Sequence, residues 1–115
     1  MFGLNTNGVI LMTNKIDLTK FDNIPSIEDG KKERKVVARI FIPYTINGWY
    51  IMGADKTEKG YNILAIEKWN TPFILKVREK ILSLSELLNK YDDIQYDENW
   101  QTIKMNDLSF IGCLK

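Results

Sequence analysis

The alternation of apolar and polar residues between positions 36 and 67 predicts three antiparallel strands. β-Branched residues dominate the first run until Pro43 ends it, and the Asn-Gly pair in residues 45–48 favours a tight turn. The charged segment 55–60, closed by a glycine, supplies the second connection. Short connections of this kind join antiparallel neighbours in a meander. The predicted strands are residues 36–42, 49–54 and 61–67.

The segment between residues 71 and 91 is open to two predictions. Its apolar residues recur at spacings of three and four, which suits one long helix. Against this, Ser83 and Glu86 form a capping box, and an N-cap residue has non-helical dihedral angles. The capping box therefore favours an extended segment over residues 73–82, followed by a helix over residues 84–91.

The two ends of the chain show weaker periodicity. Residues 1–34 contain many turn-forming residues, and their apolar positions suit either a short helix or an irregular lid packed on the core. We expect the charged run 30–35 to be a solvated connector. Near the C-terminus, residues 94–96 are predicted to form a short strand and residues 103–114 to pack on the core. The pattern predicts one α+β domain over residues 1–115, with a small, mostly antiparallel sheet of three to five strands and one main helix.

Composition limits the possible functions. A length of 115 residues provides one core, and a net charge of +1 is unlike both a nonspecific DNA binder and a DNA mimic. The sequence has no histidine, which excludes an imidazole base and histidine metal ligands. Its one cysteine, Cys113, forms neither an intrachain disulfide nor a zinc cluster, and we expect it to be a half-buried apolar residue.

The expected location is the cytoplasm. No run of about 20 apolar residues is present that would span a membrane. The first residues lack the basic region of a signal peptide, and the scarcity of cysteine fits a reducing compartment.

Neither the glycine pair nor the acidic cluster of this sequence carries a catalytic motif. Gly48 and Gly53 have the spacing of a phosphate loop, but Ala54 and Asp55 stand where that loop requires Lys and Ser or Thr. Four carboxylates surround Tyr96, and they suit a solvated acidic face, a partner-binding patch, or acid–base or metal chemistry. We predict no catalytic residue, no metal site and no cofactor.

Aromatic residues on or beside the predicted sheet are the main binding candidates. Alternation places Trp49 and Tyr50 on opposite faces; one face should pack on the helix, and the other is free to expose Tyr50. Trp69 lies in a polar, turn-forming segment, residues 68–72, where it either closes the edge of the core or anchors a partner. The predicted partner contacts are Tyr50, Lys68, Trp69, Asn70, Asp92, Asp93, Asp97 and Glu98.

Six short blocks follow one another within residues 11–100: LMTNKI, IPSIED, ARIFIP, GWYIMGAD, ILSLSELL and IQYDENW. In this order they resemble a family of small bacterial, plasmid and phage proteins known as domain of unknown function 2958. The chain departs from the family pattern at Met52 and Gly53, where the family tends to have Thr-Glu, and at Lys80, where it usually has glycine. The resemblance implies an α+β domain encoded on mobile elements, and it supplies no established catalytic residues to assign to this chain.

These observations together predict a non-catalytic protein-binding module of a phage or plasmid. Its predicted partner is a host protein or ribonucleoprotein complex, such as a CRISPR or restriction complex that the module inhibits. The alternative is a single-stranded nucleic-acid-binding protein whose aromatic residues stack on bases while Lys68, Lys76 and Arg78 contact phosphates. A third class is an enzyme that uses the carboxylates, but the sequence identifies no substrate for it.

Overall fold

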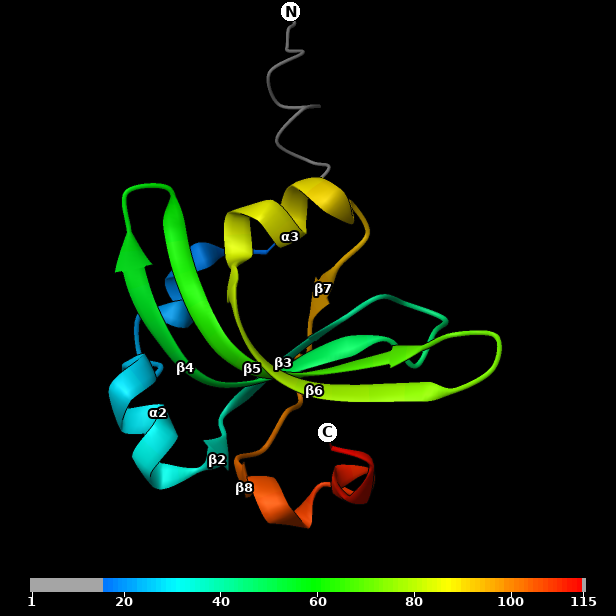
Figure 1. Cartoon of the computed structure of the whole chain (residues 1–115). Helices are drawn as coiled ribbons and strands as arrows, with labels where there is room; N and C mark the ends of the chain where they lie inside the picture. The colour runs from blue at the N-terminus through cyan, green and yellow to red at the C-terminus, as the bar shows by residue number, and fades with distance from the viewer. Residues whose placement is uncertain (1–15, 115) are drawn as a thin grey trace, which may run out of the picture.

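Five antiparallel strands form the main sheet, in the order β6-β5-β4-β3-β7 (Figure 1). The computed structural model describes residues 16–114. A second, two-stranded sheet pairs β2 with β8. The strands are β2 (Lys35–Val36), β3 (Ala38–Phe41), β4 (Gly48–Thr57), β5 (Gly60–Asn70), β6 (Leu75–Ser83), β7 (Gln95–Tyr96) and β8 (Ile103–Lys104). The predicted α+β class and the predicted meander are confirmed.

The central strands are longer than the sequence pattern predicts. The pairing of β4 with β5 continues through the charged positions to Thr57 and Gly60, which leaves a turn of only two residues. The side chains of that charged segment stay in solvent, so their charge does not end the strand. At its other end β5 extends to Asn70, so the prediction of a loop from residue 68 is wrong for residues 68–70.

The helices are α2 (Ile27–Glu33) and α3 (Leu84–Lys90), with short 3₁₀ turns η1 (Leu18–Phe21), η2 (Met105–Asp107) and η3 (Ile111–Cys113). The capping-box prediction for α3 is confirmed, because Ser83 Oγ accepts a hydrogen bond from the Glu86 backbone N–H at 3.3 Å. The strand β6 precedes it, as that prediction requires. Between residues 16 and 114, no helix is long and apolar enough to cross a membrane.

The prediction that residues 30–35 form a solvated connector is wrong, because Gly30 and the charged residues after it complete α2. Ser26 caps the helix by accepting the Asp29 N–H at 3.1 Å. Gly30 lies directly on β4: a Cβ atom at this position would be 2.5 Å from the carbonyl oxygen of Met52. Gly53 on β4 makes the reciprocal approach, with a Cβ position 2.7 Å from the carbonyl oxygen of Ser26. Two glycines thus allow the helix backbone to contact the strand backbone.

Both faces of the main sheet are covered. One face, here named the α3 face, packs against α3 and η1, and its core includes Trp49, Ile51 and Leu84. The other, the α2 face, packs against α2 and the C-terminal segment, as the sequence predicts for residues 103–114. Cys113 in that segment is exposed, so its expected half-burial is wrong: the segment packs through other side chains, which are Met105, Leu108, Phe110, Ile111 and Leu114.

Candidate functional site

Tyr50, one of the predicted partner contacts, is buried on the α2 face with 7% of its surface exposed. Its ring packs against Trp100 and Phe110, with centroid distances of 5.6 and 4.8 Å. The expectation that Tyr50 is exposed is therefore wrong. The sheet pattern predicts two faces but does not show that a segment about fifty residues further along the chain covers the second one.

Trp69 lies near the end of β5 and closes the edge of the core on the α3 face. It is half-buried, and its ring contacts Trp49 and Tyr91 at centroid distances of 5.8 and 5.3 Å. Its neighbour Lys68 lies on the opposite face, over the ring of Phe110 at 4.5 Å. Of the two interpretations of Trp69, closing the core edge is the one that these contacts support.

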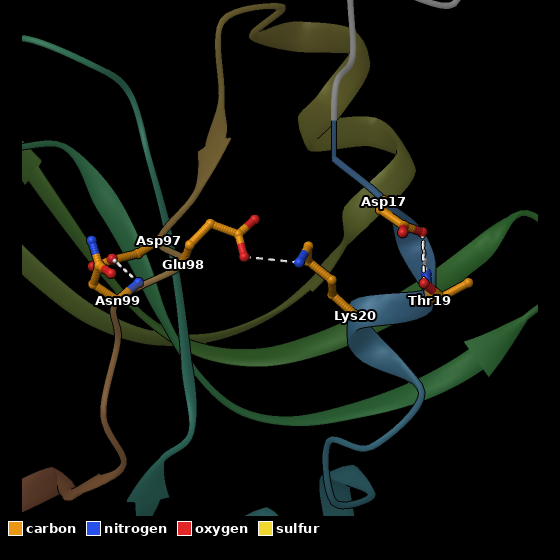
Figure 2. A network of polar contacts seen from close by, with 6 residues as sticks. All are labelled: Asp17, Thr19, Lys20, Asp97, Glu98 and Asn99. Atoms are coloured by element: carbon orange, nitrogen blue, oxygen red, sulfur yellow. Dashed lines mark hydrogen bonds and ion pairs between the residues drawn. The ribbon is translucent and has the colours of Figure 1, made fainter.

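The acidic segment lies at the other edge of the sheet, beside β7. Asp97 accepts a hydrogen bond from Arg39 at 3.0 Å. Glu98 pairs with Lys20 at 2.8 Å (Figure 2). The hydrogen bond to Glu98 raises the pKa of Lys20. Asp97 thus links the segment after β7 to β3, and Glu98 links the same segment to η1. Both carboxylates are engaged within the chain. Asp92 and Asp93 are exposed in the turn after α3.

The structure therefore does not bring the predicted contacts together. Tyr50 lies inside the α2 face, Trp69 beside the β6 edge, and Asp97 and Glu98 beside the β7 edge. Asn70 ends β5, where its backbone N–H donates to Asn47 Oδ1 at 2.8 Å. In the described part of the chain, no three potential metal-ligating side chains lie together.

A different surface stands out at the end of the sheet, where two hairpin loops lie side by side (right side of Figure 1). We name residues 43–46 and 71–74 the hairpin tips. Tyr44 is fully exposed and Phe73 is 96% exposed, while Ile46 and Ile74 are each about half exposed. The hydrogen bond between Asn47 and Asn70 ties the two loops to each other.

Hydrogen bonds within each loop hold the hairpin tips in place. In the first loop, the Thr45 hydroxyl donates to the Ile42 carbonyl at 2.7 Å and accepts the Asn47 N–H at 3.1 Å. In the second, the Thr71 hydroxyl donates to the Ile74 carbonyl at 2.8 Å and accepts the N–H of the same residue at 3.1 Å. The exposed side chains are thus presented on ordered turns.

Tyr44 also has an uncommon backbone conformation. Its φ of 65° lies in the left-handed region, which costs a non-glycine residue about 1 kcal/mol or more. Strain of this kind persists only where the surrounding structure holds it, and it is concentrated at functional sites. Arg34, the C-cap of α2, has a similar φ of 55°, and there the helix end accounts for it; at Tyr44 the conformation belongs to the turn of the first hairpin tip.

Next to the tips, a groove runs along β6 on the α3 face. It consists of two adjoining hollows of ≈ 240 and ≈ 200 Å³ that share Glu67 and Lys80. Lys80 pairs with Glu67 at 2.9 Å, and Glu67 also accepts the Trp49 Nε1–H at 2.9 Å. Three cationic residues of β6 line the groove, and we name them the cation row: Lys76, Arg78 and Lys80.

The sequence contained a signal for the hairpin tips that the prediction did not use. Residues 42–48 and 69–75 contain no charged residue, although 27% of the chain is charged. Each segment has turn-forming residues and also large apolar ones. Tyr44 falls beside the predicted sheet, but alternation assigns a face only within a strand and says nothing about a loop.

Comparisons of the chain with family models, curated proteins and solved structures find no match. The resemblance to domain of unknown function 2958 thus stays a prediction. Interpretation of the surface consequently depends on the geometry of the described residues.

Proposed function

We propose that this chain is a non-catalytic protein-binding module that contacts its partner through the hairpin tips. The observation that carries the proposal is the pair of almost fully exposed aromatic side chains, Tyr44 and Phe73, on neighbouring ordered loops. Large apolar residues grouped at the surface of a small protein are typical of interaction sites. Aromatic anchors of this kind provide most of the binding energy at many protein interfaces.

The absence of charge favours a protein partner over nucleic acid at this surface. Cores of protein interfaces are depleted in charged residues and enriched in aromatic ones, as are residues 42–48 and 69–75. A site for single-stranded nucleic acid combines aromatic residues with cations that follow the phosphates. The tips instead combine their aromatic residues with Ile46 and Ile74. The half-exposed side chains of these isoleucines suit an apolar recess on a partner protein.

The internal hydrogen bonds of the loops support the same proposal. Ordering a flexible loop on binding costs free energy, so a surface that is already ordered retains more of its contact energy as affinity. The two threonine-centred turns and the Asn47–Asn70 link supply that order before any partner arrives.

The class of partner rests on the resemblance stated above. A family encoded by phages and plasmids supports a host-defence complex, of the CRISPR or restriction type, that the module inhibits. The structure changes the proposed contact residues: Tyr50, which is buried, is replaced by Tyr44 and Phe73.

Photo-crosslinking in host cells tests the proposal. A photoreactive phenylalanine analogue replaces Phe73 or Tyr44, and the control carries it at Lys59, in the exposed turn between β4 and β5. We expect the same host protein to be captured from both tip positions and not from the control. The proposal is wrong if capture is equal at all three positions.

The captured protein then allows a quantitative test. We expect Tyr44→Ser and Phe73→Ser each to weaken binding by about 30-fold, as loss of about 2 kcal/mol at a hot spot implies. Leu18→Ser, at an exposed apolar residue outside the tips, serves as the matched control. Plating efficiency of a phage on a host with an active defence system shows whether the same variants lose inhibition.

A further inference from the structure

The strand β6 lies at one edge of the main sheet, beyond β5 (Figure 1). Among the described residues, its outer side makes one backbone pairing, an isolated parallel bridge between Val77 and Leu114. From residue 78 to residue 83, no described strand pairs with that side. An edge of this length presents a series of backbone N–H and C=O groups that another extended chain can pair with.

The cation row defines the chemistry on one side of this edge. Its members are separated by two residues, so they project from the same side of the strand about 6.7 Å apart. In the described part of the chain, Lys80 is paired with Glu67, whereas Lys76 and Arg78 make no ion pair. Lys90 and Glu86 of α3 line the adjoining hollow, so the groove has four cationic residues against the two carboxylates of Glu67 and Glu86.

The opposite side of β6 has a different character. Glu79 is held by Arg34 through two hydrogen bonds of 2.7 and 3.0 Å, so its charge is compensated. Ile81, two residues further, is 52% exposed and offers an apolar contact. An added strand would therefore meet cations on one side and a neutralised, partly apolar surface on the other.

We propose that the free edge of β6 binds an extended peptide in which acidic residues alternate with apolar ones. The peptide adds as a further strand, its backbone pairs with residues 78–83, and its carboxylates lie beside Arg78 and Lys80 of the cation row. Its apolar side chains contact Ile81 on the opposite side. The inference goes beyond the proposed function, because this edge and the hairpin tips are separate surfaces.

A peptide fits these observations better than single-stranded nucleic acid. A strand edge offers alternating backbone donors and acceptors, which a peptide matches and a sugar–phosphate chain does not. The aromatic rings beside the groove, Trp69 and Tyr91, pack against each other and against Trp49. Their contacts are directed toward one another, so they form part of the core edge and not an open stacking platform.

The test uses a blocked nine-residue peptide of alternating Glu and Val, with a Gln-for-Glu peptide as its control, and calorimetry at low and high salt. We expect the acidic peptide to bind more tightly at low salt. Replacing the whole cation row by Gln should weaken binding of the acidic peptide by about tenfold, since each opposite-charge pair across strands contributes up to about fivefold. The matched triple variant with Gln at Lys56, Lys59 and Lys104, all exposed and outside the groove, should change binding less than twofold. Equal losses in the two triple variants would contradict the proposal.

Amide hydrogen exchange distinguishes strand addition from a purely electrostatic contact. We expect the peptide to slow exchange within residues 78–83, and unchanged exchange there would overturn the inference. Tighter binding of a nine-nucleotide oligothymidine than of the peptide would overturn it as well. The Tyr44→Ser and Phe73→Ser variants should bind the peptide normally, so a failure of the hairpin-tip proposal leaves this result unaffected.

Discussion

A single methyl group added at Gly30 should destabilise the protein, although alanine is the better helix former. The new Cβ would lie 2.5 Å from the carbonyl oxygen of Met52 and 2.8 Å from its carbonyl carbon. Both atoms belong to the backbone of Met52, which lies at the β-bulge of β4 between Ile51 and Gly53. Because the residues on either side of the bulge are paired with β5, this backbone cannot move away without disturbing those pairs. The helix must move outward, and the packing of Ile27 against the α2 face is lost in part.

The expected change in the free energy of unfolding of Gly30→Ala follows from two opposing effects. Replacing a helix-interior glycine by alanine gains up to about 1 kcal/mol from backbone entropy. Overpacking against a rigid neighbour costs about 3 kcal/mol at the upper end of its usual range, which a contact this short warrants. We expect Gly30→Ala to lower the free energy of unfolding by about 2 kcal/mol, or the melting temperature by roughly 8 °C for a domain of this size.

The assay is urea denaturation followed by circular dichroism, with Gly112→Ala as the matched control. Gly112 also lies in a helical turn, but a Cβ there would have no atom within 4 Å, so that variant should be as stable as the parent or slightly more so. If Gly30→Ala were instead more stable than the parent, helix propensity would outweigh the contact, and the close approach of α2 to β4 would be refuted.

Three further stability predictions follow from individual polar contacts. The Arg34 guanidinium lowers the pKa of Glu79, so this pair stabilises the fold above the ordinary carboxyl pKa and loses its effect as the pH falls through the lowered value. Glu79→Gln should cost about 1 kcal/mol at pH 7 and progressively less as the pH falls below the ordinary carboxyl pKa, as measured by urea midpoints. Ser83→Ala removes the N-cap of α3 and should cost about 1 kcal/mol, whereas Ser109→Ala, at an exposed turn, should stay within about 0.5 kcal/mol. Trp100→Phe keeps an aromatic ring but loses the indole N–H that donates to a backbone carbonyl at 3.1 Å, and it should cost about 1 kcal/mol in the same assay.

Local signals account for the parts of the fold that the sequence predicted. The alternation around β4 is a property of neighbouring residues, and the capping box at Ser83 specifies a helix start within four positions. The helix α2 was predicted less well, because residues 1–34 suited either a short helix or an irregular lid and the charged run 30–35 suited a connector. Ser26 is a local helix-start signal, but the contact of Gly30 with β4 joins positions that are distant in sequence.

The candidate surface was harder to predict because exposure depends on what covers each face. Tyr50 and Tyr44 are similar side chains six residues apart, yet one is buried beneath Trp100 and Phe110 and the other is fully exposed. The covering residues come from the C-terminal segment, and only the folded chain brings them to the α2 face. No property of the residues next to Tyr50 contains that information.

The covered faces limit where this protein can bind anything. A small domain with one open sheet face commonly binds through that face, but here α3 and η1 fill one side and α2 with the C-terminal segment fills the other. Binding through the sheet itself is then left to its ends and edges. The β7 edge is occupied by the Arg39–Asp97 and Lys20–Glu98 pairs, whereas the hairpin tips and the outer side of β6 retain exposed apolar or cationic groups. Residues 71–74 lead directly into β6, but the Val77–Leu114 bridge lies between them and the open part of that edge. A partner at the hairpin tips and a strand beside residues 78–83 therefore contact separate surfaces, which can be tested independently.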